Sequence, residues 1–377
     1  MLKILEKLIS AKSISPNQDG ALDYVKEILE KYGFKCYLKE FGTGIEKTTN
    51  LYAEFGSNGK NLCFAGHVDV VPTGDETLWN FPPFKMTIEE NTIYGRGVVD
   101  MKGAVACMVK VLIEHAKSHN NNKVSLLLTS DEEASGTYGT KVMLEWMKKH
   151  NIKIDFSIIG EPTSSKVVGD TIKIGRRGSI NFELKINGKQ GHVAYPDFAI
   201  NPNNIIIRIL NNITHYKLDN GNKIFQPSNI EITSIDVGNN TTNLIPQTAT
   251  AKFNIRFNNI KTSDQIISDM NFLVKKYTSD YTLTTKVNSQ AFVTEITDFM
   301  NEFSDIVKDI YSISPEFSTS GGTSDARFIK DNCPVLEFGL LNQTAHQINE
   351  RAEFKDLQKL YTVYYRAIKS YHNEGYS

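Results

Sequence analysis

Histidines and carboxylates recur along this sequence close to the ends of apolar runs that predict buried strands. The residues with this placement, or at the start of a predicted helix, are His67, Asp69, Asp100, Glu132, Glu133, Glu161 and His346. Imidazole and carboxylate ligands without thiolates suit zinc or a neighbouring divalent metal. Two histidines and three carboxylates are enough for two ions that share one acid, with Asp100 as the candidate bridge. Two such ions activate a shared water and polarise a carbonyl oxygen, so the set predicts metal-assisted hydrolysis of an amide.

The adjacent acids Glu132 and Glu133 would divide metal binding and proton transfer between them. Only one of two neighbouring side chains can readily coordinate, so the other is free to carry a proton. With Asp131 they form three consecutive acids after an apolar run, and their mutual repulsion is costly unless a cation lies among them. A plain solvated turn is the alternative interpretation.

His67 and Asp69 are two residues apart near the end of the apolar run 62–71, so on a strand they point to the same side. This spacing is typical of a metal-binding imidazole whose other nitrogen is oriented by a carboxylate. A core histidine beside a loop acid is the alternative. Taken alone, Asp100 is more often a helix N-cap than a ligand, and His346 is more often a loop histidine.

The elements that must carry these residues alternate between strand and helix. The apolar runs 62–71, 123–129 and 155–159 predict strands of a sheet that helices cover on both sides. Ligands of such α/β sheets bind beyond the carboxyl ends of the strands, so the polar residues would converge on one crevice. We therefore expect an α/β fold with a mixed, mostly parallel sheet flanked by helices.

The pattern changes near residue 178. Alternating apolar and polar residues predict strands at 180–186, 229–235, 248–256 and 281–287, with two helices to cover one face of the sheet. We interpret this segment as an inserted α+β domain. The expected division is a catalytic domain in two parts, residues 1–177 and 293–377, and an inserted domain of residues 178–292.

Composition excludes several other classes of protein. The chain has 377 residues with 42 basic and 43 acidic side chains, and no basic stripe that would indicate a nucleic-acid or anionic-membrane partner. No window is apolar over the length that a membrane span needs, and the charged N-terminus does not read as a signal peptide. Four scattered cysteines predict reduced thiols in a cytoplasmic protein.

Several motifs resemble the dinuclear-zinc aminoacylase/carboxypeptidase superfamily. They are Gly66-His67-Val68-Asp69, Gly95-Arg96-Gly97 with Asp100-Met101-Lys102-Gly103, Asp131-Glu132-Glu133 and Gly160-Glu161-Pro162. Within it, three more motifs resemble the succinyl-diaminopimelate desuccinylase family: Gly175-Arg176-Arg177-Gly178-Ser179, Gly191-His192-Val193-Ala194-Tyr195-Pro196 and Gly321-Gly322-Thr323-Ser324-Asp325-Ala326-Arg327-Phe328. The resemblance covers nearly the whole chain in the same order.

The resemblance implies a zinc-exopeptidase-like fold with two Zn²⁺ per subunit, for which Co²⁺ or Mn²⁺ could substitute. One zinc would be held by His67 and Glu161 and the other by Glu133 and His346, with Asp100 as the bridge. The resemblance also implies a cis peptide after Asp100. Two further roles follow from it: Glu132 would be general base and then acid, and Asp69 would orient His67.

The implied reaction is hydrolysis of N-succinyl-LL-2,6-diaminopimelate to succinate and LL-2,6-diaminopimelate, for lysine and cell-wall synthesis. The inserted domain would form a homodimer, in which His192 stabilises the oxyanion in the partner's site. Arg177 and Arg256 would bind substrate carboxylates, because guanidinium pairs bidentately with carboxylate. Hydrogen bonds to the substrate would come from Ser179, Asn243, Gly322 and Thr323.

Some alternatives remain at this level. Each arginine could equally form a surface salt bridge, and His192 could be a turn histidine. Desuccinylases often have two adjacent asparagines where this chain has Thr242-Asn243. A zinc deacylase or dipeptidase of another acyl specificity is a second candidate function. A non-catalytic ligand-binding relative is a third, although such a protein would have no use for Glu132.

Overall fold

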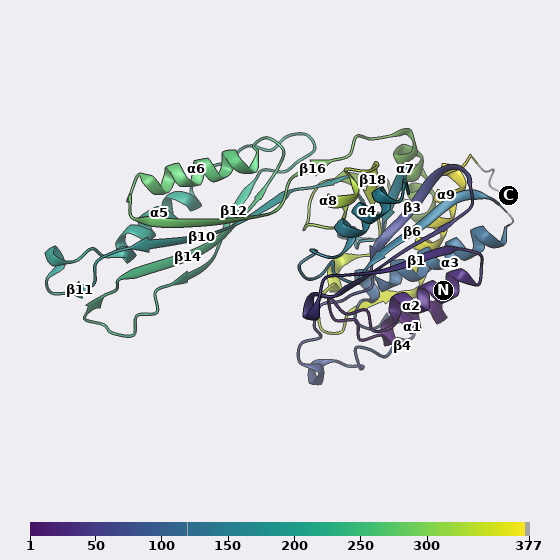
Figure 1. The fold of residues 1–377 in the computed structure, drawn as a ribbon, viewed down its shortest axis with the longest axis horizontal. Helices are drawn as coiled ribbons and strands as arrows, with labels where there is room; N and C mark the ends of the chain where they lie inside the picture. The colour runs from purple at the N-terminus through teal and green to yellow at the C-terminus, as the bar shows by residue number, and fades with distance from the viewer. Residues whose placement is uncertain (119, 374–377) are drawn as a thin grey trace. The chain divides into compact units, whose positions relative to one another are not determined.

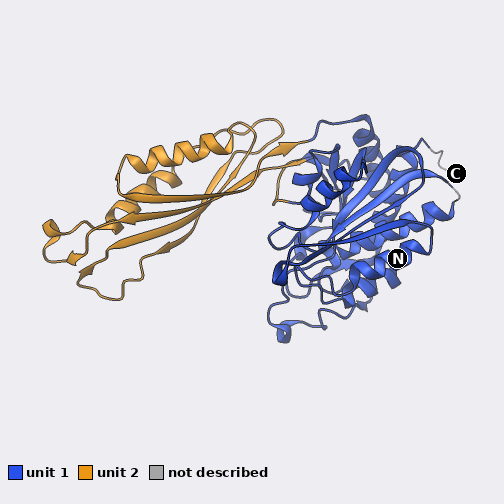
Figure 2. Ribbon diagram, viewed as in Figure 1, with its two compact units in different colours: residues 1–174, 294–318, 324–377 blue, residues 175–293, 319–323 orange. Residues whose placement is uncertain are grey.

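The computed structural model describes residues 1–118 and 120–373, which divide into two compact units (Figure 2). Unit 1 comprises residues 1–174, 294–318 and those from 324 onward, and unit 2 comprises residues 175–293 and 319–323. From the sequence, the short segment 319–323 is expected in the catalytic domain. Hydrogen bonds explain its membership of unit 2: Thr319 Oγ1 donates to the Ile224 carbonyl (2.7 Å), and Arg176 Nη1 donates to the Gly322 carbonyl (3.2 Å).

An eight-stranded sheet forms the centre of unit 1 (Figure 1). In spatial order its strands are β1 (Lys35–Phe41), β2 (Thr48–Phe55), β6 (Asn122–Thr129), β3 (Asn58–His67), β7 (Phe156–Ile159), β18 (Val335–Glu337), β8 (Thr171–Lys173) and β17 (Glu316–Ser318). The pairs β6–β3, β3–β7, β7–β18 and β8–β17 are parallel, and the remaining three pairs are antiparallel. The expected mixed, mostly parallel sheet is therefore confirmed.

Helices pack around this sheet because the central strands are apolar on both faces. One group of mutually contacting helices contains α1 (Leu2–Ser10), α2 (Ala21–Glu30), α3 (Gly103–Lys117), α7 (Asp298–Tyr311) and α9 (Phe354–Tyr371). A second group, α4 (Thr140–Lys149) and α8 (Ala326–Ile329), contacts β6 and β18. Helix α3 is apolar almost all round and nearly all of its residues are buried, as a helix between other helices and a sheet must be.

A small antiparallel sheet in unit 1 brings two distant segments together. Its strands lie in the order β19 (Arg351–Glu353), β5 (Thr92–Tyr94) and β4 (Thr87–Glu89). Because β19 pairs with β5, the chain that follows His346 lies beside the chain that leads to Asp100. Among the helices of residues 1–118 and 120–373, none has the length and apolar character needed to cross a membrane.

Unit 2 contains a four-stranded antiparallel sheet in the order β12 (Asn229–Asp236), β14 (Thr248–Phe257), β10 (Gly178–Asn187) and β15 (Tyr281–Ser289). Alternate residues of β10 are buried in a core that they share with α5 (Pro202–Thr214) and α6 (Ser263–Lys275). Two short ribbons complete the unit: β9 (Gly175–Arg176) with β16 (Phe292–Val293), and β11 (Gly191–His192) with β13 (Leu244–Ile245).

Candidate metal centre

The end of strand β3 carries the first candidate ligand. His67 is the last residue of this central strand and is buried, and its ring Nδ1 lies 2.9 Å from the main-chain carbonyl of Asp69. A carbonyl only accepts hydrogen bonds, so Nδ1 carries the proton of the neutral ring and Nε2 keeps a free lone pair. That is the tautomer a metal-binding imidazole requires.

The Asp69 carboxylate lies near the His67 ring and also contacts the loop that carries Glu132 and Glu133. Its Oδ1 is 3.7 Å from His67 Nδ1, whereas Oδ2 accepts the backbone N–H of Glu133 at 3.1 Å and Oδ1 accepts that of Glu132 at 3.4 Å. The residue thus orients the ring through its carbonyl and holds the loop after β6 through its carboxylate. A charged acceptor that is fully buried makes this anchor strong, because no water competes for the two N–H groups.

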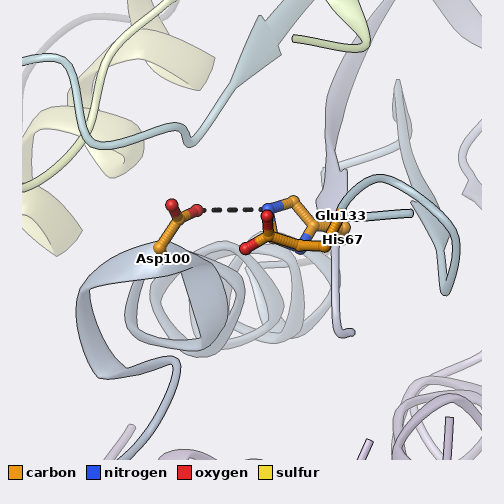
Figure 3. Close-up of side chains that lie close together, drawn as sticks. All are labelled: His67, Asp100 and Glu133. Atoms are coloured by element: carbon orange, nitrogen blue, oxygen red, sulfur yellow. Dashed lines mark hydrogen bonds and ion pairs between the residues drawn. The ribbon is translucent and has the colours of Figure 1, made fainter. Parts of the chain in front are cut away.

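Asp100 lies between two imidazoles. Its Oδ1 is 3.2 Å from His67 Nε2 and its Oδ2 is 3.2 Å from His346 Nε2. Figure 3 shows the Asp100 and His67 side chains facing each other, with Glu133 beside them. A carboxylate that presents each oxygen to a different ring has the geometry of a bridging ligand. The peptide bond between Asp100 and Met101 is cis.

The remaining candidate ligands complete two donor sets. Glu133 Oε1 lies 2.8 Å from His346 Nε2, and Glu161 Oε1 lies 3.6 Å from His67 Nε2. The resemblance assigns these same two pairs to the two ions. Two groups of donor atoms, His67–Asp100–Glu133 and His67–Glu132–Glu161, have all their ligand atoms within 4.8 Å of one another. Neither group includes His346, whose place in the centre comes instead from its contacts with Asp100 and Glu133.

The electrostatics of this cluster fit a resident cation. Burial raises the pKa of Glu161 well above its usual range, and the like charges of Asp100 and Glu132 raise it further. Its Oε1 is buried and forms no hydrogen bond with any residue of the ranges 1–118 and 120–373. A buried acceptor without a donor is costly, and a divalent ion would remove that cost. The donor set, imidazole and carboxylate without thiolate, is also one that zinc accepts.

Two opposing effects act on the titrating groups without a metal. Burial alone would raise the pKa of Asp100, but hydrogen bonds to His346 and His67 hold it below its usual value. Those contacts with Asp100 and Glu133 raise the pKa of His346 to about 10. Burial lowers the pKa of His67, but its hydrogen bond to Asp100 and the nearby acids raise it overall. Without a metal both rings therefore carry the positive charge that neutralises the acids, and a bound metal would take the place of the proton on each Nε2.

The surroundings of Glu132 change its pKa. Burial raises the pKa of its carboxyl well above the usual range, although His67 opposes this effect, and the nearby acids Asp325, Glu133 and Asp100 reinforce it. A carboxyl with a raised pKa holds a proton more readily than a free one, which suits a group that takes a proton from water and later delivers it.

Unit 2 brings together the two candidate arginines. Ser179 on β10 and Asn229 on β12 both lie opposite Arg256 on β14, and Arg177 Nη1 donates to Asn229 Oδ1 at 2.7 Å. Burial, and then the charge of Arg256, lower the pKa of Arg177. Within the described residues neither guanidinium forms an ion pair, so the salt-bridge alternative does not account for them. Among the described residues, the two guanidinium groups are thus half-buried cations without a counter-anion.

The other candidates for substrate contact differ in their surroundings. Ser179 is buried, and its hydroxyl oxygen accepts a hydrogen bond from Asn254 Nδ2 (3.1 Å). Gly322 is exposed in the segment 319–323 and Thr323 beside it is half-buried. Asn243 is exposed beside His192, and its carbonyl accepts the N–H of Val193 (3.1 Å).

His192 lies at the opposite end of unit 2 from the arginine pair. It is exposed on β11, and Figure 1 shows β11 and β16 at the two ends of this unit. Strand β10 alone, with ten residues, separates Ser179 from His192 by about 30 Å. His192 Nδ1 accepts the N–H of Ala194 at 3.0 Å, so the neutral ring carries its proton on Nε2. That exposed N–H is a donor of the kind an oxyanion needs.

Arg96 and Glu350 are two buried residues near the metal centre to which the sequence assigns no role, although Arg96 is part of a motif. The carboxylate of Glu350 accepts hydrogen bonds from the backbone N–H of Val99 (2.9 Å) and of Asp100 (3.2 Å) and from the Arg96 guanidinium (2.9 Å). No local sequence pattern singles out Glu350, which lies in a loop four residues after His346.

Comparison with known proteins identifies the family. The chain belongs to peptidase family M20/M25/M40, whose family model matches residues 63–370. A succinyl-diaminopimelate desuccinylase of Orientia tsutsugamushi (strain Ikeda) is 50% identical over 370 residues, which cover 98% of this chain and 95% of that protein. The resemblance that the motifs indicate is therefore confirmed.

Solved structures of the same family have this fold. The M20 family metallo-carboxypeptidase Sso-CP2 from Sulfolobus solfataricus matches with a TM-score of 0.79 at 20% identity, covering 98% of each chain. The Bacillus subtilis YXEP protein, described as a dinuclear metal binding peptidase from the M20 family, matches with a TM-score of 0.69 at 14% identity, covering 97% of this chain and 98% of that one.

Proposed function

We propose that this chain is a metal-dependent amide hydrolase that cleaves N-succinyl-LL-2,6-diaminopimelate to succinate and LL-2,6-diaminopimelate. The observation that carries the proposal is the position of Asp100, whose two oxygens face two imidazoles inside a cluster of acids. The 50% identity to the Orientia tsutsugamushi desuccinylase supports the choice of substrate. The product amine would serve lysine and cell-wall synthesis, and the four free cysteines suit a cytoplasmic enzyme.

Two divalent ions, zinc in this proposal, would be held by His67 and Glu161 on one side and by Glu133 and His346 on the other, with Asp100 shared. When bound, they would make a water nucleophilic at neutral pH and polarise the carbonyl of the scissile amide. The chain supplies the rest. Glu132 takes the proton of the attacking water and delivers it to the leaving nitrogen, while Asp69 holds the backbone of residues 132 and 133 in place.

Substrate carboxylates would bind the guanidinium groups of Arg177 and Arg256. The substrate carries a succinyl carboxylate and two amino-acid carboxylates, and bidentate pairing with arginine distinguishes carboxylate from an uncharged acyl end. Ser179, Asn243, Gly322 and Thr323 would add hydrogen bonds. This arrangement favours a succinyl over an acetyl group, because an acetyl group leaves a desolvated cation without a partner.

We also propose a homodimer in which His192 acts in the partner's site. His192 and Asn243 lie about 30 Å along unit 2 from the arginine pair, too far for one small substrate to contact both within one chain. A second copy resolves this, because its His192 and Asn243 can together reach the substrate that the first copy's arginines bind. The N–H at Nε2 would then donate to the oxyanion that forms at the scissile carbon.

A substrate panel tests the proposal. Metal-depleted protein and the same protein with two equivalents of zinc would be assayed with succinyl-diaminopimelate, its acetyl analogue and a dipeptide. We expect zinc-dependent hydrolysis with the succinyl substrate strongly preferred. Preference for the acetyl substrate or the dipeptide would indicate a deacylase or dipeptidase of another specificity. Tight substrate binding without turnover by the two-zinc protein would indicate a ligand-binding relative.

A further inference from the structure

A single buried carboxylate organises the backbone on which Asp100 lies. Glu350 Oε2 accepts the N–H of Gly97 (2.8 Å), and Oε1 accepts those of Val99 (2.9 Å) and Asp100 (3.2 Å). The Arg96 guanidinium donates to Oε2 as well (2.9 Å). A carboxylate has about four acceptor positions, and here all are used by donors from one turn of chain. Only 1% of Glu350 is exposed, so water does not compete for these bonds.

Arg96 extends this network to the other loops of the metal centre. Its Nη1 also donates to the Gln347 carbonyl (3.1 Å), next to the candidate ligand His346, and its Nη2 donates to the Pro72 carbonyl (3.2 Å). The guanidinium carbon lies 5.0 Å from the centre of the Trp79 ring, which shields it from solvent. Three segments far apart in sequence therefore meet at one ion pair.

Gly97 permits this approach of backbone to carboxylate. Its φ is +83°, and a Cβ at this position would come within 2.7 Å of Val70 Cγ1 and 3.0 Å of Lys102 Cδ. A side chain would thus push the turn away from Val70 and disturb the N–H groups that Glu350 accepts. Gly97, Arg96 and Glu350 therefore depend on one another for the conformation of this turn.

We propose that Glu350, together with Arg96, is a positioning residue that sets the metal affinity of this site by holding Asp100 and His346 at their mutual distance. The inference rests on the proposed metal site. Neither side chain coordinates: Glu350 acts on Asp100 through the backbone N–H groups of residues 97–100, and Arg96 acts on the His346 loop through the Gln347 carbonyl.

A contribution to folding stability does not by itself explain the buried ion pair of Arg96 and Glu350. A buried ion pair can often be replaced by apolar residues of similar volume without loss of stability, since desolvation offsets the Coulomb attraction. An apolar residue at position 350 could not accept three backbone N–H groups, which would then be buried without a partner. A carboxylate at position 350 is therefore required by the turn that carries Asp100, whose N–H groups it accepts.

Glu350→Gln tests the inference. The amide keeps the shape but replaces one acceptor oxygen with an NH₂ group, so in either orientation a donor faces N–H groups. We expect each metal dissociation constant to rise about 10–100-fold, the usual effect of losing a hydrogen-bond partner behind a ligand. Calorimetric titration of the metal-free full chain with zinc, and with cobalt as a spectroscopic probe, measures both constants without reference to activity.

Two further variants sharpen the result. Glu353→Gln is the matched control, because Glu353 lies three residues on and contacts Thr92 Oγ1 (2.8 Å) rather than the Asp100 turn. Its metal constants should equal those of the wild type. Arg96→Lys keeps the charge beside Glu350 but cannot reach both the Pro72 and Gln347 carbonyls, so we expect weakening confined to the ion held by His346. This variant carries the test if Glu350→Gln does not fold.

The outcomes separate this inference from the proposed function. If wild-type protein takes up no metal, the proposed function fails, and the positioning role fails with it. If the wild type binds two ions and the folded Glu350→Gln or Arg96→Lys variants bind both with unchanged constants, only the positioning role is overturned. A lower melting temperature with unchanged metal constants has the same meaning, since it would assign the pair a purely structural role.

Discussion

Replacing Glu132 with glutamine separates proton transfer from metal binding. Glutamine has the same shape, and the backbone N–H of residue 132 can keep its contact with Asp69 (3.4 Å). The pairs that define the proposed ligand sets, His67 with Asp100 and His346 with both Asp100 and Glu133, do not include this side chain. The variant should therefore bind two metal ions like the wild type, while it loses the only nearby acid assigned to carry the proton.

The expected loss can be stated as a rate. General acid–base catalysis contributes about 10²–10⁴-fold, so kcat should fall by at least that factor, or about 3–5 kcal/mol in the activation barrier. The KM for the succinyl substrate should change little, because the role proposed for Glu132 is proton transfer and not the binding of carboxylates. Metal content is measured by mass spectrometry on the same preparation as the kinetics. Glu145→Gln, an exposed change on α4, serves as control.

Two results would refute this reasoning. Glu132 lies in a group of donor atoms with His67 and Glu161, so it could itself be a ligand. A variant that holds one ion instead of two would show that it is. A kcat within tenfold of the wild type, with both ions bound, would assign the proton to another residue.

Three more predictions follow from the geometry. His346→Ala should weaken one zinc selectively in a metal titration, and equal loss of both ions would contradict the ligand sets. Hydrogen bonds to Asp100 and Glu133 raise the pKa of His346 to about 10, so the ring of the metal-free protein is protonated at neutral pH. Because a metal binds only the neutral ring, the metal affinity should rise with pH, by up to tenfold per pH unit below pH 10. Calorimetry in buffers of different ionisation enthalpy measures the proton release. Mixed dimers of His192→Ala and Glu132→Gln chains should recover about half of the wild-type activity per dimer, since one of the two sites is then complete, and no recovery would exclude action in the partner's site.

Several features of the fold could be predicted because they depend on local pattern. The run that becomes β3 is apolar on both faces, so its place in the middle of a covered sheet follows from its sequence. The alternation along β10 likewise predicts a sheet with one face buried by helices. The segment 319–323 could not be assigned this way, because its membership of unit 2 depends on hydrogen bonds to residues near 176 and 224.

The candidate site was predictable in its members but not in its contacts. His67, Asp100, Glu133, Glu161 and His346 stand out by type and position, and the structure brings their donor atoms together. Nothing in the sequence shows that the Asp69 carboxylate, which lies 3.7 Å from the His67 ring, also accepts the backbone N–H groups of residues 132 and 133. These contacts join residues more than 60 positions apart in sequence, so no local pattern predicts them.

By itself the sequence determined the chemistry that this chain can support, because residue types and their order beyond apolar runs are local properties. Only the tertiary structure decided which oxygen of Asp100 faces which imidazole, and that Glu350 lies behind the turn of residues 97–100. The physical reason is that hydrogen bonds depend steeply on distance and angle, whereas the partners here are 33 to about 250 residues apart in sequence. Such contacts are set by packing of the whole unit, and no local pattern encodes them.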